Sequence, residues 1–529
     1  MAIKMPKLPF RNEQIFFIDA KQINLDRTLV NLYVLLKHNG GRTRSRVSQA
    51  NKQVGEKELM QVFADMEVAG QASGIRENPL AVRGWLRANL MDMVYRGQGP
   101  DKETFTSLKP IHLFSYRIRN QKNTRDYNSA DQVYSMLSVR PAVREELQNY
   151  LSEGWDKTSS TVSPSQLLDI DSLGLLRMID IVQKTQPDAT GDAKPVFDKI
   201  GPLLPEEAAC YCDDVHRLLQ YRGVIPRHVL LDYLKTLTGF HLSLYLLRLI
   251  RYVPELVSAG YLPPERPLDI VLDVTEEPDS AAGQLAMEDA SQFYNSIPDY
   301  VRAVFAINNS LAALPFDARD LPAAERLKQA VTAISEQDAG FMAHCRQQLN
   351  EVYKGTPPEL HKTLDDLVAL ETDDINRYMA VFLYVRGAFH QLYHTNLLDS
   401  LLLKNTENGM LAQGKSRRHK RRFVLGTRLL EALVQISVLR ADAAADTYYS
   451  TAVSIEEFTE HLHQRYGLVI NGLGLARFQD SDLRTHQAFS QNVEALKYKL
   501  RQIGFYTQLS DAYLLQKIRP RYTLNSQPA

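Results

Sequence analysis

The sequence predicts a mainly α, multi-domain helical array with winged-helix-like units at its N- and C-terminal ends. Its 529 residues exceed the size at which a single hydrophobic core stops growing, roughly 250–300 residues, so several domains are expected. Hydrophobic residues make up 44% of the chain and charged residues 23%, which is typical of globular proteins with real cores. Helical periodicity dominates residues 205–405, and stretches with strand-like alternation are few.

Shifts in composition divide the chain into five expected regions. The small polar stretch 158–164 is typical of a linker, and the alternating, β-branched residues 267–275 predict a strand within an otherwise helical pattern. We expect a helix-turn-helix-like unit in 1–78, a mixed connecting region in 79–157, a helical domain with one isolated strand in 158–280, a helical bundle in 281–414, and a basic loop with a winged-helix-like domain in 415–529.

The N-terminal unit favours three short helices within residues 25–70. The first ends at Gly40, because glycine tolerates the left-handed backbone that a helix end requires. A second helix is expected over residues 44–51 and a third over residues 56–69. The alternative to a helix-turn-helix is a small helical packing module with a solvated basic loop.

The C-terminal region favours a winged helix, with three amphipathic helices and a strand pair. A capping box opens the second helix at Ser454, and the third helix covers residues 483–503. Residues 513–522 are expected to fold back as strands or a wing. In winged helices the third helix can enter the major groove while the wing meets phosphate, although such domains also dock proteins.

Charge is distributed unevenly along the chain. The 62 basic residues balance 62 acidic ones, so attraction to nucleic acid has to come from local clusters such as residues 415–422. Four groups are predicted to contact duplex DNA: in this cluster Lys415, Arg417, Arg418, Lys420, Arg421 and Arg422; on the third helix Arg484, Gln491, Lys497 and Arg501; in the wing Lys517, Arg519 and Arg521; and in the N-terminal unit Arg42, Arg44 and Arg46.

One stretch matches a phosphate-binding pattern. Residues 409–416, Gly-Met-Leu-Ala-Gln-Gly-Lys-Ser, satisfy the P-loop expression G-x-x-x-x-G-K-[ST]. A working P-loop needs a buried strand before it and a helix that packs on a sheet after it. Polar residues precede Gly409 and a run of cations follows Ser416, so a flexible basic loop is the favoured interpretation and a nucleotide-binding enzyme the alternative.

Other reactive groups give no catalytic or metal site. The pair His390 and His394 has zinc-protease spacing, but Gln391 stands where the general base would be. The spacing of Cys210, Cys212 and His216 is too short for a usual zinc ribbon. Acidic residues such as Asp269 and Asp273 flank the strand, but Thr275 stands where a metal-dependent nuclease would have a lysine. We therefore expect no catalytic residues, no metal ligands and no cofactor.

Three cysteines are too few for a disulfide framework, which is typical of a reducing compartment. No secretory signal is visible at the start of the chain. The most apolar run, residues 229–253, carries five charged or imidazole side chains and is expected to be a buried helix pair and not a membrane span. A cytoplasmic location follows as an expectation.

The C-terminal hydrophobic pattern resembles a known family. Residues 422–434, 458–470 and 504–512, with 268–274 as a further match, are similar to accessory subunits of bacterial multi-gene antiphage systems of the methylation-associated or phosphorothioation-dependent kind. The resemblance covers the last fifth of the chain and transfers no functional residue. It implies a non-catalytic partner of an ATPase, nuclease or methyltransferase encoded nearby.

Three functions follow as hypotheses. The first is a DNA-binding or assembly subunit of a defence complex, with double-stranded DNA and other subunits as partners. The second is a protein-docking scaffold that does not touch nucleic acid. The third is a P-loop nucleotide-binding enzyme.

Overall fold

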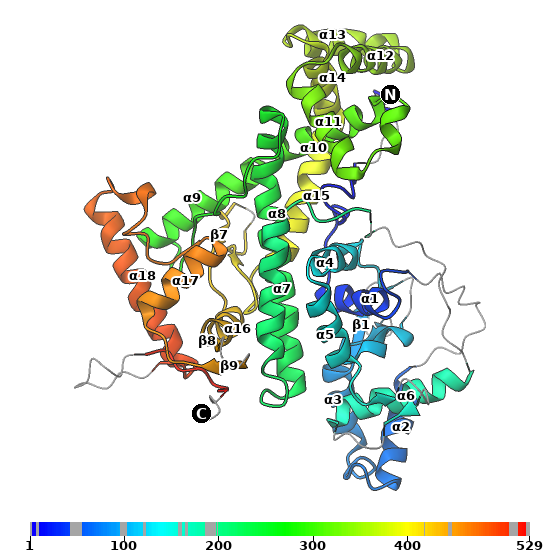
Figure 1. Ribbon diagram of the computed structural model, residues 1–529, viewed down its shortest axis with the longest axis vertical. Helices are drawn as coiled ribbons and strands as arrows, with labels where there is room; N and C mark the ends of the chain where they lie inside the picture. The colour runs from blue at the N-terminus through cyan, green and yellow to red at the C-terminus, as the bar shows by residue number, and fades with distance from the viewer. Residues whose placement is uncertain are drawn as a thin grey trace. The chain divides into compact units, whose positions relative to one another are not determined.

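The protein is described by a computed structural model whose described residues form two compact units (Figure 1). Unit 1 comprises Met1–Gln22, Lys199–Cys210 and Thr236–Ala529, and unit 2 comprises Ile23–Asp198 and Tyr211–Lys235. The described residues are 3–6, 10–42, 55–95, 103–119, 123–156, 161–163, 168–185, 197, 199–416, 418–442, 447–506 and 517–524. The mainly α class is confirmed, while the finer division into five regions stays a prediction.

Unit 2 is built from short helices and two small antiparallel strand pairs. Its elements are α1 (Leu25–Lys37), α2 (Glu56–Val68), α3 (Pro79–Asn89), β1 (Met91–Tyr95), β2 (Glu103–Leu108), η2 (Leu113–Arg117), α4 (Ser129–Leu137), α5 (Pro141–Leu151), β3 (Trp155–Asp156), β4 (Thr161–Val162) and α6 (Ile170–Thr185). Strand β1 pairs with β2, and β3 pairs with β4. Both units share α7 (Pro205–Leu219) and α8 (Arg227–Ala259).

Helix α1 begins and ends as the sequence indicates. The Asn24 side chain accepts a hydrogen bond from the Arg27 amide and so caps the first turn. Gly40 has φ +84°, and a Cβ there would lie 3.0 Å from Phe197 and 3.1 Å from Tyr134. Both conformation and space therefore require glycine. The second expected helix, residues 44–51, lies outside the described residues, and the helix-turn-helix stays a prediction.

The longer part of unit 1 begins with helices. They are α9 (Ala281–Asn295), α10 (Ile297–Ala313), η4 (Asp317–Asp320), α11 (Ala323–Ser335), α12 (Ala339–Gly355), η5 (Pro358–Leu360), α13 (His361–Ala369), α14 (Asp374–Phe382), the π-helical turn η6 (Leu383–Gly387) and α15 (Ala388–Leu401). The end of unit 1 contains α16 (Thr427–Ser437), β8 (Leu439–Asp442), β9 (Thr447–Ser450), α17 (Ile455–Tyr466), η7 (Ala476–Phe478) and α18 (Leu483–Gln502).

Helix α8 differs from the sequence prediction. The expected helix pair in residues 229–253 is one continuous helix, α8, because the single Gly239 costs only about 1 kcal/mol in a helix that is buried nearly all round. Residues 336–338 separate α11 from α12. Gln337 has φ +52° between them, and the Asp338 side chain caps α12 by accepting from the Phe341 amide.

The strand predicted as isolated is the centre of a small sheet. Strand β5 (Ile270–Val271) pairs in parallel with β10 (Leu468–Val469), and β6 (Leu411–Ala412) pairs antiparallel with β7 (Arg422–Phe423). A parallel bridge between Asp273 and Val424 joins the two pairs, with the order β10, β5, β7, β6. The prediction that this strand is isolated was therefore wrong. Its partners lie about 150 to 200 residues further along the chain, so local periodicity does not reveal them.

Every amide from residue 270 to 275 has an acceptor. Three of these amides donate to the neighbouring strands, at the carbonyls of Gly467, Val469 and Phe423. The Val271 amide donates to Asp289 and the Val274 amide to Asn492, each at 2.8 Å, and the Thr275 amide donates to Asp273 at 2.9 Å. Buried backbone amides need such partners, so side chains from α9 and α18 replace the strand neighbours that a wider sheet would supply.

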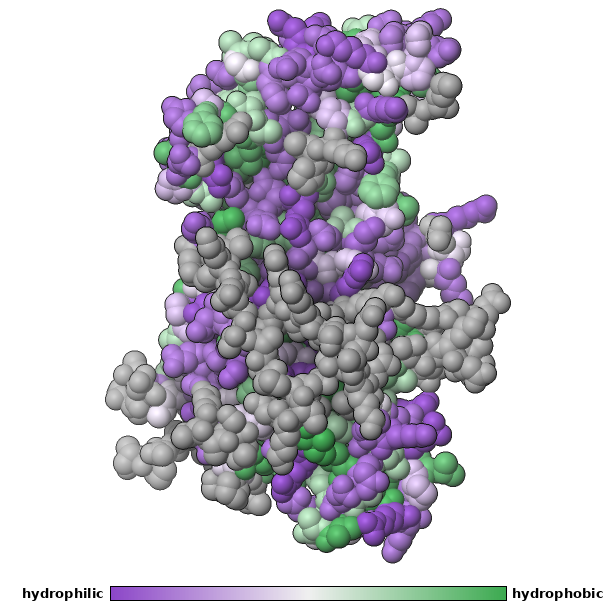
Figure 2. Space-filling model, turned by 90° about the vertical axis from the view of Figure 1, so that its right-hand side faces the viewer, coloured by the Kyte–Doolittle hydropathy of each residue, from purple (hydrophilic) through white to green (hydrophobic). Residues whose placement is uncertain are grey.

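Among the described residues, no helix combines the length and apolar character that crossing a bilayer requires. The coloured residues in Figure 2 are mainly hydrophilic, with hydrophobic residues in small scattered groups.

We predict that Asn492→Ala lowers the free energy of unfolding by about 2–3 kcal/mol, because it leaves the buried Val274 amide without its acceptor and the Leu272 and Ile470 carbonyls without their donor. Urea denaturation measures the change. Gln491→Ala, at the exposed neighbouring position, is the control and is expected to change stability by less than about 0.5 kcal/mol. Equal losses in the two variants would contradict the role of Asn492.

Candidate nucleic-acid interface

The basic cluster, residues 415–422, lies on the β6–β7 hairpin of unit 1. Lys415, Arg418 and Lys420 are exposed in the loop, and Arg417 lies outside the described residues. Gln413 links the loop to Asn405 and also bonds to His419 within the loop. The loop therefore lies beside the segment that follows α15.

Arg421 is held by an ion pair. Its guanidinium binds both oxygens of Asp399, at 2.7 and 2.9 Å, and lies 4.4 Å from the centre of the Tyr294 ring. Lys404 and the Tyr294 hydroxyl also donate to Asp399. Burial alone would raise the pKa of Asp399, but these hydrogen bonds outweigh it and lower that pKa. Asp399 therefore stays charged and binds Arg421 on both oxygens.

Arg422 is buried. Its side chain is 8% exposed, and its Nε lies 2.8 Å from Oδ2 of Asp273, whose side chain is fully buried. Desolvation by burial raises the pKa of Asp273, against the opposing effects of Thr275 and Arg422. Of the five described cations in the cluster, Arg421 and Arg422 thus link β7 to its neighbours, and Lys415, Arg418 and Lys420 face solvent.

The surroundings of residues 409–416 differ from those of a P-loop. Helix α15 precedes Gly409, and the next element after Ser416 is strand β7; the next described helix starts at Thr427. The Gly409 amide donates to Thr406, and the Met410 amide donates to Leu402. Among the described residues, the element directly before Gly409 is a helix and the element directly after Ser416 is a strand, which is the reverse of the strand–loop–helix order that cradles phosphate.

Helix α18 presents one continuous exposed face. Asp482 caps the helix by accepting from the Thr485 amide. Exposed positions recur every three or four residues along the helix, as expected for one face. They include Arg484, Gln487, Gln491, Glu494, Tyr498 and Arg501. The opposite face packs Phe489, Leu496 and Leu500 into the core.

The two lysines of α18, Lys497 and Lys499, form ion pairs with carboxylates. Lys497 forms an ion pair with Glu494 at 2.7 Å, which neutralises the one acid on the exposed face. Lys499 is buried and bonds to Glu276 and to the Leu425 carbonyl. The two arginines of this helix, Arg484 and Arg501, are exposed.

Residues 517–521 lie beside the C-terminal end of α18. Ile518 forms bridges with Tyr506 and Val453, and the Arg519 amide donates to the Phe505 carbonyl. Arg521 reaches the Ile503 carbonyl and lies 3.6 Å from Glu431. The exposed residues Lys517, Arg519 and Arg521 are thus carried by a segment that lies beside the end of α18 where Arg501 is found. We call this set, with the exposed face of α18, the α18 surface.

The winged-helix prediction for this region is neither confirmed nor contradicted. Three helices are present, α16, α17 and α18, and the capping box at Ser454 is formed. The described strand pair, β8 with β9, lies between the first and second helices. Of residues 513–522, where strands or a wing were expected, 513–516 lie outside the described residues, and Ile518 forms bridges with Tyr506 and Val453.

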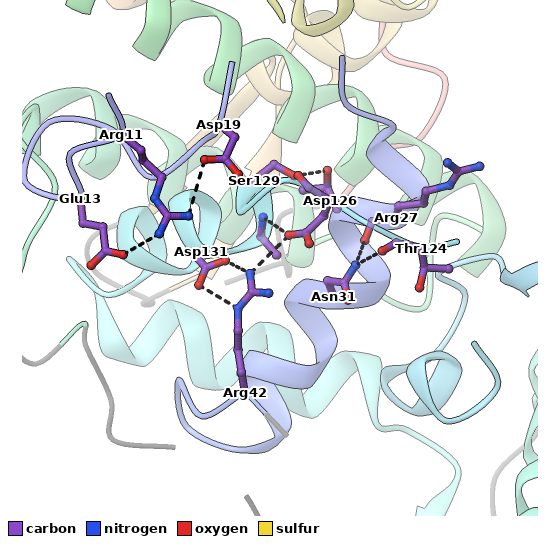
Figure 3. Close-up of polar contacts among 12 residues, drawn as sticks. Arg11, Glu13, Asp19, Arg27, Asn31, Arg42, Thr124, Asp126, Ser129 and Asp131 are labelled. Carbon is purple, nitrogen blue, oxygen red and sulfur yellow. Dashed lines mark hydrogen bonds and ion pairs between the residues drawn. The ribbon is translucent and has the colours of Figure 1, made fainter. Parts of the chain in front are cut away.

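In unit 2, Arg42 is neutralised by two acids (Figure 3). Its Nε donates to Oδ1 of Asp131 at 3.0 Å, a second nitrogen contacts Oδ2 of the same carboxylate, and Asp126 lies 3.6 Å away. Arg44 and Arg46 lie outside the described residues.

The candidate metal-binding side chains have other partners. The Nδ1 atom of His394 bonds to the His390 carbonyl, and its ring packs on Tyr300; burial lowers the pKa of both histidines to about 4. The Cys212 thiol donates to the Met136 carbonyl, and His216 bonds to Glu146.

Sequence reasoning did not identify Asp289 and Asn492 as buried polar side chains. Arg477 binds both oxygens of Asp289, which has no exposed surface. Polar residues on predicted amphipathic helices are normally assigned to solvent, and nothing in the local pattern marks Asp289 and Asn492 as buried.

The described residues form a mainly helical protein with exposed cations on α18 and beside its C-terminal end. Its class is given by comparison with known families: residues 7–522 match the family described as methylation-associated defense system protein MAD7. The match covers nearly the whole chain, so the chain belongs to this family. The resemblance drawn from the last fifth of the sequence is thereby confirmed over a much longer span. No curated protein and no solved structure matches the chain.

We predict that Arg421→Ala lowers the free energy of unfolding by about 2 kcal/mol, because Asp399 loses its two-point partner in a largely buried site. Lys420→Ala, its exposed neighbour, is the control and is expected to be nearly neutral. Chemical denaturation at pH 7 compares the two variants. A neutral Arg421→Ala would show that this arginine has no structural role.

The same pair predicts a pH dependence. A carboxyl whose pKa is lower in the folded state contributes stability above its unfolded pKa and loses it as the pH falls through the folded pKa. The pKa of Asp399 is lowered from 3.8. The stability difference between wild type and Asp399→Asn is therefore expected to be constant above about pH 5 and to shrink below about pH 4. Denaturation curves measured from pH 3 to pH 7 test this, and a difference that grows on acidification would contradict it.

Proposed function

We propose that this protein is a non-catalytic, DNA-binding subunit of a methylation-associated antiphage defence complex, and that it works in the cytoplasm. The observation that carries the proposal is the α18 surface, in which one helix face exposes arginine, glutamine and tyrosine side chains next to a second group of cations. Bond-breaking is left to an ATPase or nuclease of the same system.

The exposed face of α18 has the chemistry that base reading requires. Glutamine pairs with adenine through two hydrogen bonds, and arginine pairs with guanine in the same way. Gln487, Gln491 and Arg484 occupy successive turns on this face, and the core contacts of Phe489 and Leu500 keep the helix fixed while it projects them.

Phosphate contacts are assigned to the cations around this helix. Arg501, Lys517, Arg519 and Arg521 adjoin its C-terminal end, and Lys415, Arg418 and Lys420 extend from the β6–β7 loop. Lysine and arginine bind phosphate without reading sequence and release counterions on doing so. Arg417, Arg44 and Arg46 remain part of the proposal as further phosphate contacts. Arg421 and Arg422 are assigned a smaller part in phosphate binding, because they form ion pairs with Asp399 and Asp273.

We predict that the double variant Arg484→Glu, Arg501→Glu weakens duplex binding by about tenfold or more at low salt and reduces the slope of log K against log salt by about 2, since each lost phosphate contact reduces it by about 1. Fluorescence anisotropy with a labelled duplex, measured from 50 to 200 mM salt, gives both quantities. The triple variant Lys415→Glu, Arg418→Glu, Lys420→Glu tests the loop in the same assay.

The matched control is Lys362→Glu, which reverses an exposed cation on α13. It changes the net charge without touching the α18 surface, so its effect measures the general field alone. Unchanged affinity in both the double and the triple variant would refute DNA contact through these surfaces. Co-purification with a neighbouring gene product in the absence of any nucleic-acid binding would then favour the docking scaffold.

A further inference from the structure

The π-helical turn η6 brings exposed apolar side chains onto one face of α15. In a π turn the residue at i+5 bonds to residue i, so Phe389 follows Tyr384 along the helix axis. Leu392 lies three residues beyond Phe389, one α-helical turn further. Tyr384 is 58% exposed, Phe389 48% and Leu392 57%. We call these three residues, with the exposed Ala388 between them, the α15 stripe.

The opposite side of the same segment is firmly packed. Phe382 stacks on Phe305 of α10, and His394 packs edge-on against Tyr300 of the same helix. The α15 stripe is therefore held on a fixed element and is not a frayed end. A gathering of large apolar side chains on a fixed surface is typical of an interaction site, whereas single exposed apolar residues are ordinary.

The surroundings of the α15 stripe are cationic. Lys21 lies 3.8 Å from the centre of the Tyr393 ring and 6.0 Å from that of Phe389, and Arg386 is exposed within the stripe's own turn. Residues 383–394 contain no aspartate or glutamate. The acid closest to Lys21 in sequence, Asp19, lies 3.6 Å from Arg11 (Figure 3). The partner that complements this surface has apolar anchors flanked by acidic side chains.

We propose that the α15 stripe docks an acidic amphipathic helix of another protein of the same defence system. Apolar side chains at turn-by-turn spacing match the apolar face of a partner helix, with the acids of that helix directed at Lys21 and Arg386. Two copies of this chain would set cation against cation, which disfavours self-association through this face. Leu392 and Ala388 provide no stacking surface for bases, so the stripe is less suited to single-stranded nucleic acid.

The test measures binding of the full-length chain to each of the other purified proteins of the system by biolayer interferometry. Phe389→Glu and Leu392→Glu are expected to weaken binding of one of them by about 30-fold, the size typical of central apolar anchors. Arg386→Glu is expected to weaken the same complex and to make it less sensitive to salt. Hydrogen exchange is expected to slow in residues 384–393 when the partner is bound.

Leu370→Glu is the matched control, because Leu370, the C-cap residue of α13, is 86% exposed and lies outside the α15 stripe. Equal melting temperatures of all variants show that folding is intact. The proposal is overturned if no protein of the system binds, if the stripe variants bind as well as Leu370→Glu, or if they abolish only self-association, binding to anionic vesicles or binding to oligo-dT. Duplex-DNA affinity is measured in the same variants and is expected to be unchanged. A failure of the α15 docking proposal can therefore be distinguished from a failure of the DNA-binding proposal.

Discussion

The C-terminal part of unit 1 depends on one constraint: the backbone amides of residues 270–275 each need a hydrogen-bond acceptor. Strand β5 has only two residues and lies in a narrow sheet, so neighbouring strands alone do not supply all of these acceptors. Three distant segments supply four of the six acceptors: residues 467–469, which contain β10, strand β7, and the side chain of Asn492. A buried amide without a partner costs about 1–3 kcal/mol, so these contacts fix the position of each segment. Asn492 also fixes the rotation of α18, because the face that carries it must turn inward. The opposite face, with Gln491 and Arg484, is consequently exposed.

The same constraint explains why two arginines of the basic cluster are structural. Strand β7 lies next to β5, so Arg422 enters a buried site beside Asp273. Arg421 lies just before the strand and reaches Asp399, with its guanidinium close to the Tyr294 ring. From the sequence alone, every residue in a run of cations is equally expected to face solvent or to bind phosphate. Strand pairing makes the residues differ, because it places Arg421 and Arg422 in partly or fully buried ion pairs and leaves Lys415, Arg418 and Lys420 exposed in the loop.

Local signals in the sequence predicted local structure well. Helix periodicity, the capping box at Ser454 and the glycine at position 40 were found where expected, because neighbours within a few residues decide them. The continuity of α8 through Gly239 was missed, since burial outweighs a modest glycine penalty. The partners of β5 were missed because they are remote in sequence. The exposed face of α18 was predictable from its pattern, whereas the α15 stripe was not, because a π turn shifts the register that an α-helical pattern assumes.

The two surfaces of unit 1 differ in a way that bears on how a subunit of this kind would act. The α18 surface is polar and cationic, and its attraction to a polyanion falls steeply with salt. The α15 stripe is apolar with a cationic rim, and burial of apolar area is far less sensitive to salt. They use different residues, so binding at one need not displace a ligand from the other. A chain with both could hold a protein of the system at DNA while contributing no reaction of its own, and a rise in ionic strength would release the DNA before the protein.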